Sequence, residues 1–221
     1  MFELSLNIMD IAQNSIRADA KNVAIRIGVD AREDMMRIEI EDDGSGMGSE
    51  ALQAAADPFY TTRTTRKVGL GLPYFAMVAG MCDGGLDISS EPGEGTCVTA
   101  TMRLSHIDRA PLGDMGQTVA LLAGANPGVD FVYELSVMEA SVGEGESGFR
   151  ERGAQKPGSS ERDAQENGSR ERGSQERKFR FDSREVKAIL DGVGIGTPEV
   201  VVYMEGYINE SMQTLTGGIE L

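Results

Sequence analysis

The sequence predicts an α+β protein whose first 105 residues form one compact unit of helices and strands. Two observations carry this prediction. Residues 4–18 place apolar side chains at helical spacing, and residues 35–42 alternate apolar and charged side chains as a half-buried strand does. The length of 221 residues leaves room for a smaller α/β extension after this unit.

In the first predicted helix, at 4–18, Ile8, Ile11, Ala12 and Ser15 share one face. In the strand at 35–42, Met36, Ile38 and Ile40 lie on one side and the charged residues on the other. The other elements predicted for this unit are, in order, a strand at 23–29, a mostly buried helix at 70–82, and strands at 86–90 and 97–104 joined by a glycine-rich turn.

Residues 106–139 begin the C-terminal extension. Asp114-x-x-Gln117 resembles a capping box that opens a short helix through Leu122, and residues 130–137 could form a strand. Residues 140–177 contain three near-copies of a ten-residue unit with a Glu-Arg pair and no apolar face. Such a segment cannot bury enough surface to offset its ordering entropy, so we predict disorder, with a lone charged helix as the alternative.

Regular structure is expected to resume over 178–221. Asp182-x-x-Glu185 would cap a short helix ending near Gly192, and Thr197-Pro198 would open a second helix through about Gln213. The strands at 130–137 and 178–182 could be two arms of one hairpin that the repeats interrupt.

Composition narrows the function classes. Net charge is -15, which argues against a nucleic-acid surface or an anionic-membrane binder. The two cysteines, Cys82 and Cys97, are too far apart for a C-x-x-C pair and suit a reducing compartment. Neither a run of 18 apolar residues nor a signal-peptide pattern occurs, so we expect a soluble, cytoplasmic protein.

Asp10 and Asn14 are one helical turn apart in the first helix, and Arg17 continues the same stripe. The amide oxygen of Asn is a hard ligand suited to Mg²⁺. A carboxylate one turn away could orient or deprotonate an attacking water or hydroxyl. The simpler alternative is the solvated polar face of an amphipathic helix.

Two glycine-containing segments follow strands. In Asp43-Gly44-Ser45-Gly46, the carboxylate could accept a hydrogen bond from the amino group of adenine, and the glycines allow close backbone approach or positive φ. In Gly93-Glu-Gly-Thr96, the Thr hydroxyl could bond adenine directly or through a water. Each segment taken alone could equally be an ordinary turn.

The segment between Phe59 and Gly69 holds four Thr and three cations within nine residues. Hydroxyl and guanidinium groups suit phosphate oxygens, so this segment could be a lid over a triphosphate or an ordinary exposed loop. Gly69-Leu70-Gly71-Leu72 then opens the helix at 70–82, where free N–H groups could bind phosphate. The chain contains no Walker A loop.

In this order, the motifs resemble those of the GHKL ATPase superfamily, which includes gyrase B, the heat-shock chaperone, histidine kinases and MutL. DIAQNSIRADA is similar to the family's N box, EDDGSGM to its G1 box, DPFYTTRTTRKVGLGLPYF to its F box, lid and G2 box, and EPGEGTCVTATMRL to its last turn and strand. The Pro-Phe-x-Thr-Thr form is that of histidine kinases. The resemblance covers about residues 1–105 and implies a Bergerat fold, a two-layer α/β sandwich with a mixed sheet and helices on one face.

The resemblance also implies that Mg-ATP is bound, with Mg²⁺ on Asn14, adenine on Asp43, and the phosphates on the Gly69–Gly71 turn and the lid. The resemblance implies Asp10 as the catalytic residue. The nucleotide-binding residues that the resemblance implies are Asn14, Arg17, Asp43, Gly44, Gly46, Met47, Phe59, Thr62, Arg63, Gly69, Leu70, Gly71, Leu72 and Thr96.

Ordinary histidine kinases carry their phosphoacceptor on a helical hairpin before the N box, and only 13 residues precede Asn14 here. We therefore expect a domain without that hairpin. The sole histidine, His106, follows the last strand of the first unit, and we expect it to be structural or solvent-exposed.

The expected activity is transfer of the γ-phosphoryl group of ATP to a separate protein, or slow hydrolysis, since phosphoryl transfer needs mostly positioning and charge neutralisation. One alternative is a non-enzymatic switch or anti-sigma-like regulator whose ATP lid gates a partner. A scaffold with a vestigial nucleotide site is a third. A protein partner or phosphoacceptor is expected, and the sequence leaves its identity and the oligomeric state open.

Overall fold

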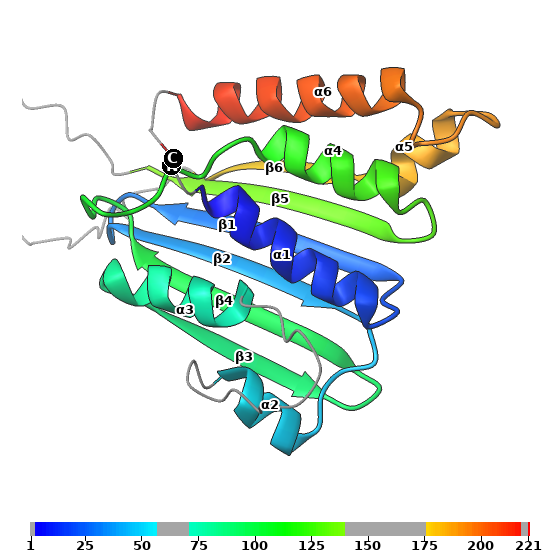
Figure 1. Ribbon diagram of the computed structural model, residues 1–221. Coiled ribbons are helices and arrows are strands. Elements are labelled where there is room, and N and C mark those ends of the chain that lie inside the picture. The colour runs from blue at the N-terminus through cyan, green and yellow to red at the C-terminus, as the bar shows by residue number, and fades with distance from the viewer. Residues whose placement is uncertain (1–2, 57–70, 140–175, 218–220) are drawn as a thin grey trace, which may run out of the picture.

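The computed structural model describes residues 3–56, 71–139, 176–217 and 221. They form a two-layer α+β sandwich, in which helices cover one face of a six-stranded mixed sheet of order β3-β4-β2-β1-β5-β6 (Figure 1). The elements in chain order are α1 (Leu4–Arg17), β1 (Asn22–Asp30), β2 (Met35–Asp42), α2 (Ser49–Ala56), α3 (Gly71–Met81), β3 (Gly85–Glu91), β4 (Gly95–Arg103), α4 (Met115–Ala125), β5 (Asp130–Met138), β6 (Glu176–Asp182), α5 (Ser183–Ile189) and α6 (Pro198–Thr216).

The core lies between the helices and the sheet, and sequence periodicity decides which side chains enter it. In α1 the face with Ile8, Ile11 and Ala12 is buried, as its helical spacing predicts. In β2 Ile38 and Ile40 are almost fully buried, while the side chains between them point to the other face of the sheet. The helices and strands expected in the first 105 residues are therefore present.

The C-terminal part completes the same sheet. β5 pairs in parallel with β1, and β6 pairs antiparallel with β5, which confirms the hairpin expected from residues 130–137 and 178–182. β6 begins two residues earlier than expected, because Glu176 and Arg177 extend its pairing with Val137 and Met138. The disorder predicted for the remaining repeats, 140–175, falls outside the described residues.

Helix starts follow local side-chain chemistry. The Asp114 carboxylate accepts a hydrogen bond from Gln117 N at 2.7 Å and caps α4 as expected. Asp182 caps α5 through Arg184 N at 3.0 Å. Thr197 precedes α6, but its hydroxyl bonds Gly194 O instead of a helical N–H. Sequence analysis did not anticipate α2, although its SEALQAAA sequence consists mostly of good helix formers.

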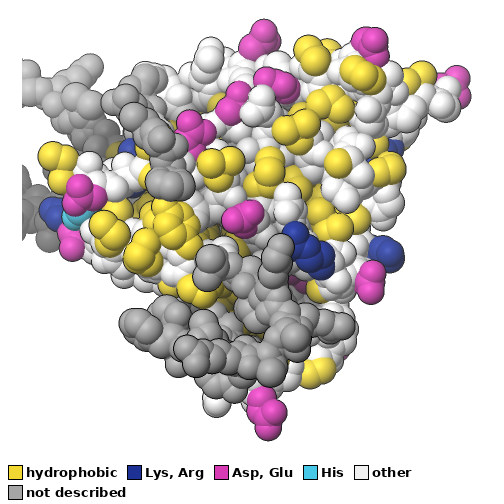
Figure 2. Space-filling view, in the orientation of Figure 1, with side chains coloured by type: hydrophobic (Ala, Val, Ile, Leu, Met, Phe, Trp, Pro, Cys, Tyr) yellow, Lys and Arg dark blue, Asp and Glu magenta, His cyan; other side chains and the backbone are white. Residues whose placement is uncertain are grey.

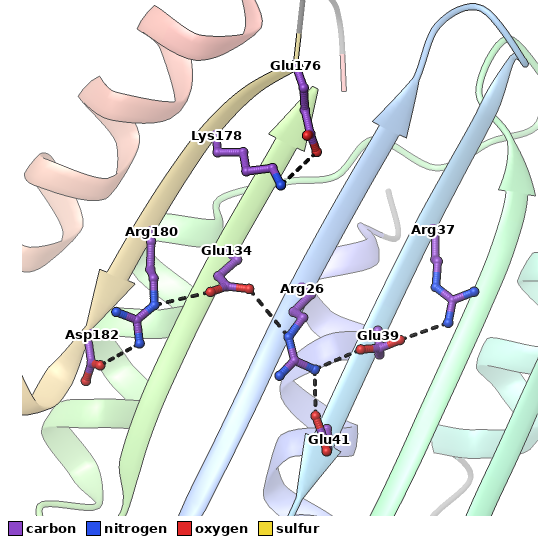
Figure 3. A network of polar contacts seen from close by, with 9 residues as sticks. All are labelled: Arg26, Arg37, Glu39, Glu41, Glu134, Glu176, Lys178, Arg180 and Asp182. Carbon is purple, nitrogen blue, oxygen red and sulfur yellow. Dashed lines mark hydrogen bonds and ion pairs between the residues drawn. The ribbon is translucent and has the colours of Figure 1, made fainter. Parts of the chain in front are cut away.

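Among the described residues, no helix covers the second face of the sheet, which carries a row of paired charges (Figure 3). Arg26 contacts Glu39, Glu41 and Glu134, and Glu134 in turn contacts Arg180. By contrast, Figure 2 shows the helical face, where hydrophobic and acidic side chains are spread and Lys or Arg is sparse among the described residues. Within the part of the chain that the structure describes, no helix is long and apolar enough to cross a lipid bilayer.

Candidate functional site

Helix α1 presents three of the predicted site residues on the face opposite its buried stripe. Asp10 and Arg17 are exposed, and Asn14 is half-buried. Arg17 Nη1 donates to Asn14 Oδ1 at 3.0 Å, and Arg17 Nη2 donates to Gln13 Oε1 at 3.4 Å. The amide oxygen of Asn14, the atom suited to a hard cation, therefore has a guanidinium partner in this structure.

A cavity of about 220 Å³ lies beside Asn14, between α1, the end of β2 and the start of β4. Its walls combine apolar side chains with a few polar groups, the composition typical of a small-molecule site. The lining residues are Ile11, Asn14, Ser15, Ala18, Asp42, Gly46, Met47, Ala55, Leu72, Thr96 and Val98. Five residues predicted from the sequence are among them, contributed by α1, the loop after β2, α3 and β4.

The carboxylate in this cavity belongs to Asp42, whereas sequence analysis assigned the role to Asp43. Asp42 Oδ2 accepts a hydrogen bond from Ser15 Oγ at 2.5 Å, and Asp42 Oδ1 accepts one from Gly44 N at 2.9 Å. The alternation of side chains along β2 explains why Asp42 lines the cavity. Asp42 is two residues beyond the buried Ile40, so its side chain points to the helical layer, where the cavity is.

Asp43 is exposed and contacts the turn between α1 and β1. Its Oδ1 accepts hydrogen bonds from Lys21 N at 2.7 Å and Asn22 N at 2.8 Å, and its Oδ2 accepts one from Asn22 Nδ2 at 2.7 Å. Partial burial raises the pKa of Asp43, but these hydrogen bonds outweigh it and leave the pKa below the ordinary value. The contacts of Asp43 thus serve to hold the turn.

The loop after β2 fits against its neighbours only because two positions lack side chains. Gly46 has φ +63°, and a Cβ there would overlap the backbone carbonyl of Glu91. A Cβ on Gly44 would lie 2.9 Å from Ala18 O. Hydrogen bonds from Ser45 N to Ala18 O and from Gly93 N to Ser45 O fasten the loop between α1 and the β3–β4 turn.

The hydroxyls of Ser90 and Thr96 lie close together where β4 borders the cavity. Ser90 Oγ on β3 accepts a hydrogen bond from Met47 N at 2.8 Å, and it lies 2.9 Å from Thr96 Oγ1. Sequence analysis predicted Met47 and Thr96 but missed Ser90. Its signal was available, because Ser90 faces Thr96 directly in the β3–β4 hairpin that the glycine-rich turn predicts.

The start of α3 packs against α1 close to Asp10. A Cβ on Gly71 would lie 3.2 Å from Asp10 Cβ, so the absence of a side chain at Gly71 permits this approach. Leu72 follows and lines the cavity. Phe59, Thr62, Arg63, Gly69 and Leu70, which sequence analysis also placed in the site, lie outside the described residues.

His106 lies away from this cavity, in the turn after β4. Its Nδ1 accepts a hydrogen bond from Asp108 N at 3.1 Å, and its Nε2 lies 4.0 Å from an oxygen of Asp83. The His106 side chain is 19% exposed. These contacts agree with a structural role in the turn.

A larger hollow, of about 370 Å³, lies on the open face of the sheet around Gly28 and Ser136. None of the predicted site residues that the structure describes lines it. Its basic side chains, Arg26, Arg37 and Arg180 among them, already contact carboxylates. The cavity beside Asn14 is therefore the better candidate for a ligand site.

The residues that line this cavity all fall within the part of the chain that resembles known proteins. Residues 3–106 match the family described as histidine kinase-, DNA gyrase B-, and HSP90-like ATPase. The chain is similar to the sensor protein kinase FleS of Pseudomonas aeruginosa, with 37% identity over 48% of this chain and 25% of that protein. It is also similar to sporulation kinase C of Bacillus subtilis, with 31% identity over 46% of this chain and 24% of the kinase.

These alignments cover only about a quarter of each kinase and less than half of this chain. Among solved structures, the N-terminal domain of a DNA repair protein is similar over 62% of this chain and 50% of its own, with a TM-score of 0.43 and 13% identity. That likeness is too loose to bear on function.

Proposed function

We propose that the protein binds Mg-ATP in the cavity between α1, β2 and β4, because residues 3–106 match the family of histidine kinase-, DNA gyrase B-, and HSP90-like ATPases. The observation that carries the proposal is the Asp42 carboxylate at the cavity wall, which Ser15 and the backbone of Gly44 hold in place. A fixed carboxylate can accept a hydrogen bond from the amino group of adenine, which guanine does not offer at that position. Asp42 thus replaces Asp43 as the proposed adenine-binding residue.

Asn14, which lines the same cavity, suits the cation. Asn14 would hold Mg²⁺ through its amide oxygen once Arg17 releases that atom. In the described residues, no group of three or more His, Cys, Asp or Glu could hold a metal ion. The proposal therefore needs the phosphate oxygens of the nucleotide as further ligands. Bound Mg²⁺ would supply neutralisation of phosphate charge.

The start of α3 would bind phosphate oxygens. The first N–H groups of a helix have no intrahelical acceptor, and α3 begins at Gly71, in contact with Asp10. Exposed Asp10 lies one turn from Asn14, so it could accept a proton from an attacking water or hydroxyl. We propose transfer of the γ-phosphoryl group to a separate protein, or slow hydrolysis, as the resulting activity.

The direct test compares the two neighbouring carboxylates by calorimetry with ATP and GTP. Asp42→Asn keeps the side-chain size but removes the charged acceptor, so ATP affinity should fall by about 1.5–3 kcal/mol, or roughly 10- to 150-fold. Asp43→Asn is the matched control and should leave ATP affinity within about twofold. Equal affinity of the wild type for ATP and GTP would refute the adenine assignment.

Turnover is tested separately, with γ-labelled ATP and the pure protein, alone and with cell extract. Label in a protein indicates phosphoryl transfer, and free phosphate indicates hydrolysis. ATP binding with neither product would contradict the enzymatic part of the proposal and favour a switch in which ATP binding itself is the signal.

A further inference from the structure

We propose that Ser15 is a positioning residue that fixes the Asp42 carboxylate and thereby sets the preference of the site for adenine. The inference rests on the proposed ATP binding and adds a specificity determinant to it. Ser15 belongs to the buried stripe of α1, where a serine would ordinarily count as a small core residue. Its hydroxyl instead contacts the Asp42 carboxylate, which lines the cavity.

The geometry gives the Ser15 hydroxyl one dominant acceptor. Ser15 is 3% exposed, so its hydroxyl needs a partner within the protein. In the described part of the chain, two acceptors lie in reach, Asp42 Oδ2 at 2.5 Å and the carbonyl oxygen of Ile11 at 3.4 Å. A hydroxyl has one hydrogen to donate, and the short contact to a carboxylate is the stronger bond.

The Ser15 bond completes a two-sided restraint on Asp42. The Gly44 N–H bonds Oδ1, and the Ser15 hydroxyl bonds Oδ2, so each oxygen has a donor that opposes rotation of the carboxylate plane. Each oxygen keeps a further lone pair for a ligand. A ligand donor then meets an acceptor whose direction is already set, which reduces the ordering cost of binding.

Ser15 also places this restraint next to the proposed cation site. It follows Asn14 directly in α1, and both residues line the same cavity. Because one helix carries both residues, the hydroxyl that holds Asp42 and the amide of Asn14 keep a fixed separation. A purely structural Ser15 would contribute to folding stability but would not affect which base is preferred.

The test measures base preference with two nucleotides, ATP and purine riboside triphosphate, which lacks only the amino group that Asp42 is proposed to bind. The wild type should bind ATP the more tightly. Ser15→Ala should weaken ATP binding about tenfold and change binding of the analogue less than twofold, so that the preference largely disappears. Ser15→Thr, which keeps the hydroxyl, should restore the preference.

Controls separate positioning from stability. Ser5 is also buried on α1 but does not line the cavity, so Ser5→Ala should retain the wild-type preference. Ser15→Cys keeps the side chain close in size with a weaker donor, and it provides the measurement if Ser15→Ala does not fold. In a double-mutant cycle, Ser15→Ala should add less than twofold to the loss caused by Asp42→Asn.

The outcomes distinguish this inference from the function on which it rests. A wild type that binds neither nucleotide, or binds both equally, refutes the proposed adenine site itself. A wild type that prefers ATP, with the same preference in Ser15→Ala and Ser15→Cys, overturns the role of Ser15 and leaves the site intact. Equal weakening of both nucleotides by Ser15→Ala would also overturn it.

Discussion

Gly46→Ala should destabilise the protein far more than Gly48→Ala, although the two glycines are two residues apart in one loop. Gly46 has φ +63°, and a Cβ there would overlap the carbonyl group of Glu91 and lie 3.1 Å from Gly95 O. These are backbone atoms, so the β3–β4 turn must move as a unit. A Cβ on Gly48 would meet no atom within 4 Å.

The magnitude follows from two terms. Left-handed backbone costs an L-residue roughly 1–2 kcal/mol. Displacing the turn would break the hydrogen bond from Gly93 N to Ser45 O, now 2.8 Å long, which contributes about 0.5–1.5 kcal/mol. Gly46→Ala should therefore lower the free energy of unfolding by about 1.5–3.5 kcal/mol, whereas Gly48→Ala should stay within about 0.5 kcal/mol of the wild type.

Urea denaturation at equilibrium measures both variants, with the m-value as a check that each unfolds in the same way. ATP affinity should fall in Gly46→Ala as well, because Gly46 and Met47 line the cavity and Met47 N bonds Ser90. If Gly46→Ala and Gly48→Ala unfold at the same urea concentration, the close approach of the two loops is wrong.

Three further predictions concern the phosphate end, the sheet and acid stability. In calorimetry, Asn14→Ala should abolish the gain in ATP affinity that Mg²⁺ gives. Asp10→Ala should leave ATP affinity within about twofold and slow phosphate release about a hundredfold or more. Unchanged turnover in both variants would exclude these roles. A chain truncated to residues 1–105 should lose cooperative thermal unfolding, because β1 would lose its β5 partner and become an edge; a wild-type melting temperature would show that this part folds alone. The side-chain hydrogen bond from Arg184 holds the pKa of Asp182 below its usual value, so this stabilisation is present above about pH 4 and is lost as the pH falls through the folded-state pKa. Asp182→Asn should lower the free energy of unfolding at pH 7 by up to about 1 kcal/mol. It should also make the free energy of unfolding depend less on pH in the acid range. An unchanged pH dependence would count against the ion pair.

Much of the fold follows from local sequence patterns. Helical spacing located α1, and the alternation of apolar and charged residues located β2. The helix repeats every 3.6 residues and the strand every two residues, and a side chain's position in that repeat decides whether it is buried. Capping chemistry placed the starts of α4 and α5 to within a residue. The pairing of β5 with β6 was expected from two strand-like segments on either side of a polar insertion.

The sequence by itself was enough to predict an ATP site, because motif order and spacing are properties of the chain. Only the tertiary structure decided which of two adjacent carboxylates enters the cavity. Asp42, the last residue of the strand, lines the cavity beside α1, whereas Asp43 contacts the turn between α1 and β1. The same holds for Ser15, Ser90 and the place of β5 beside β1, since contacts between residues distant in sequence arise only when the layers pack.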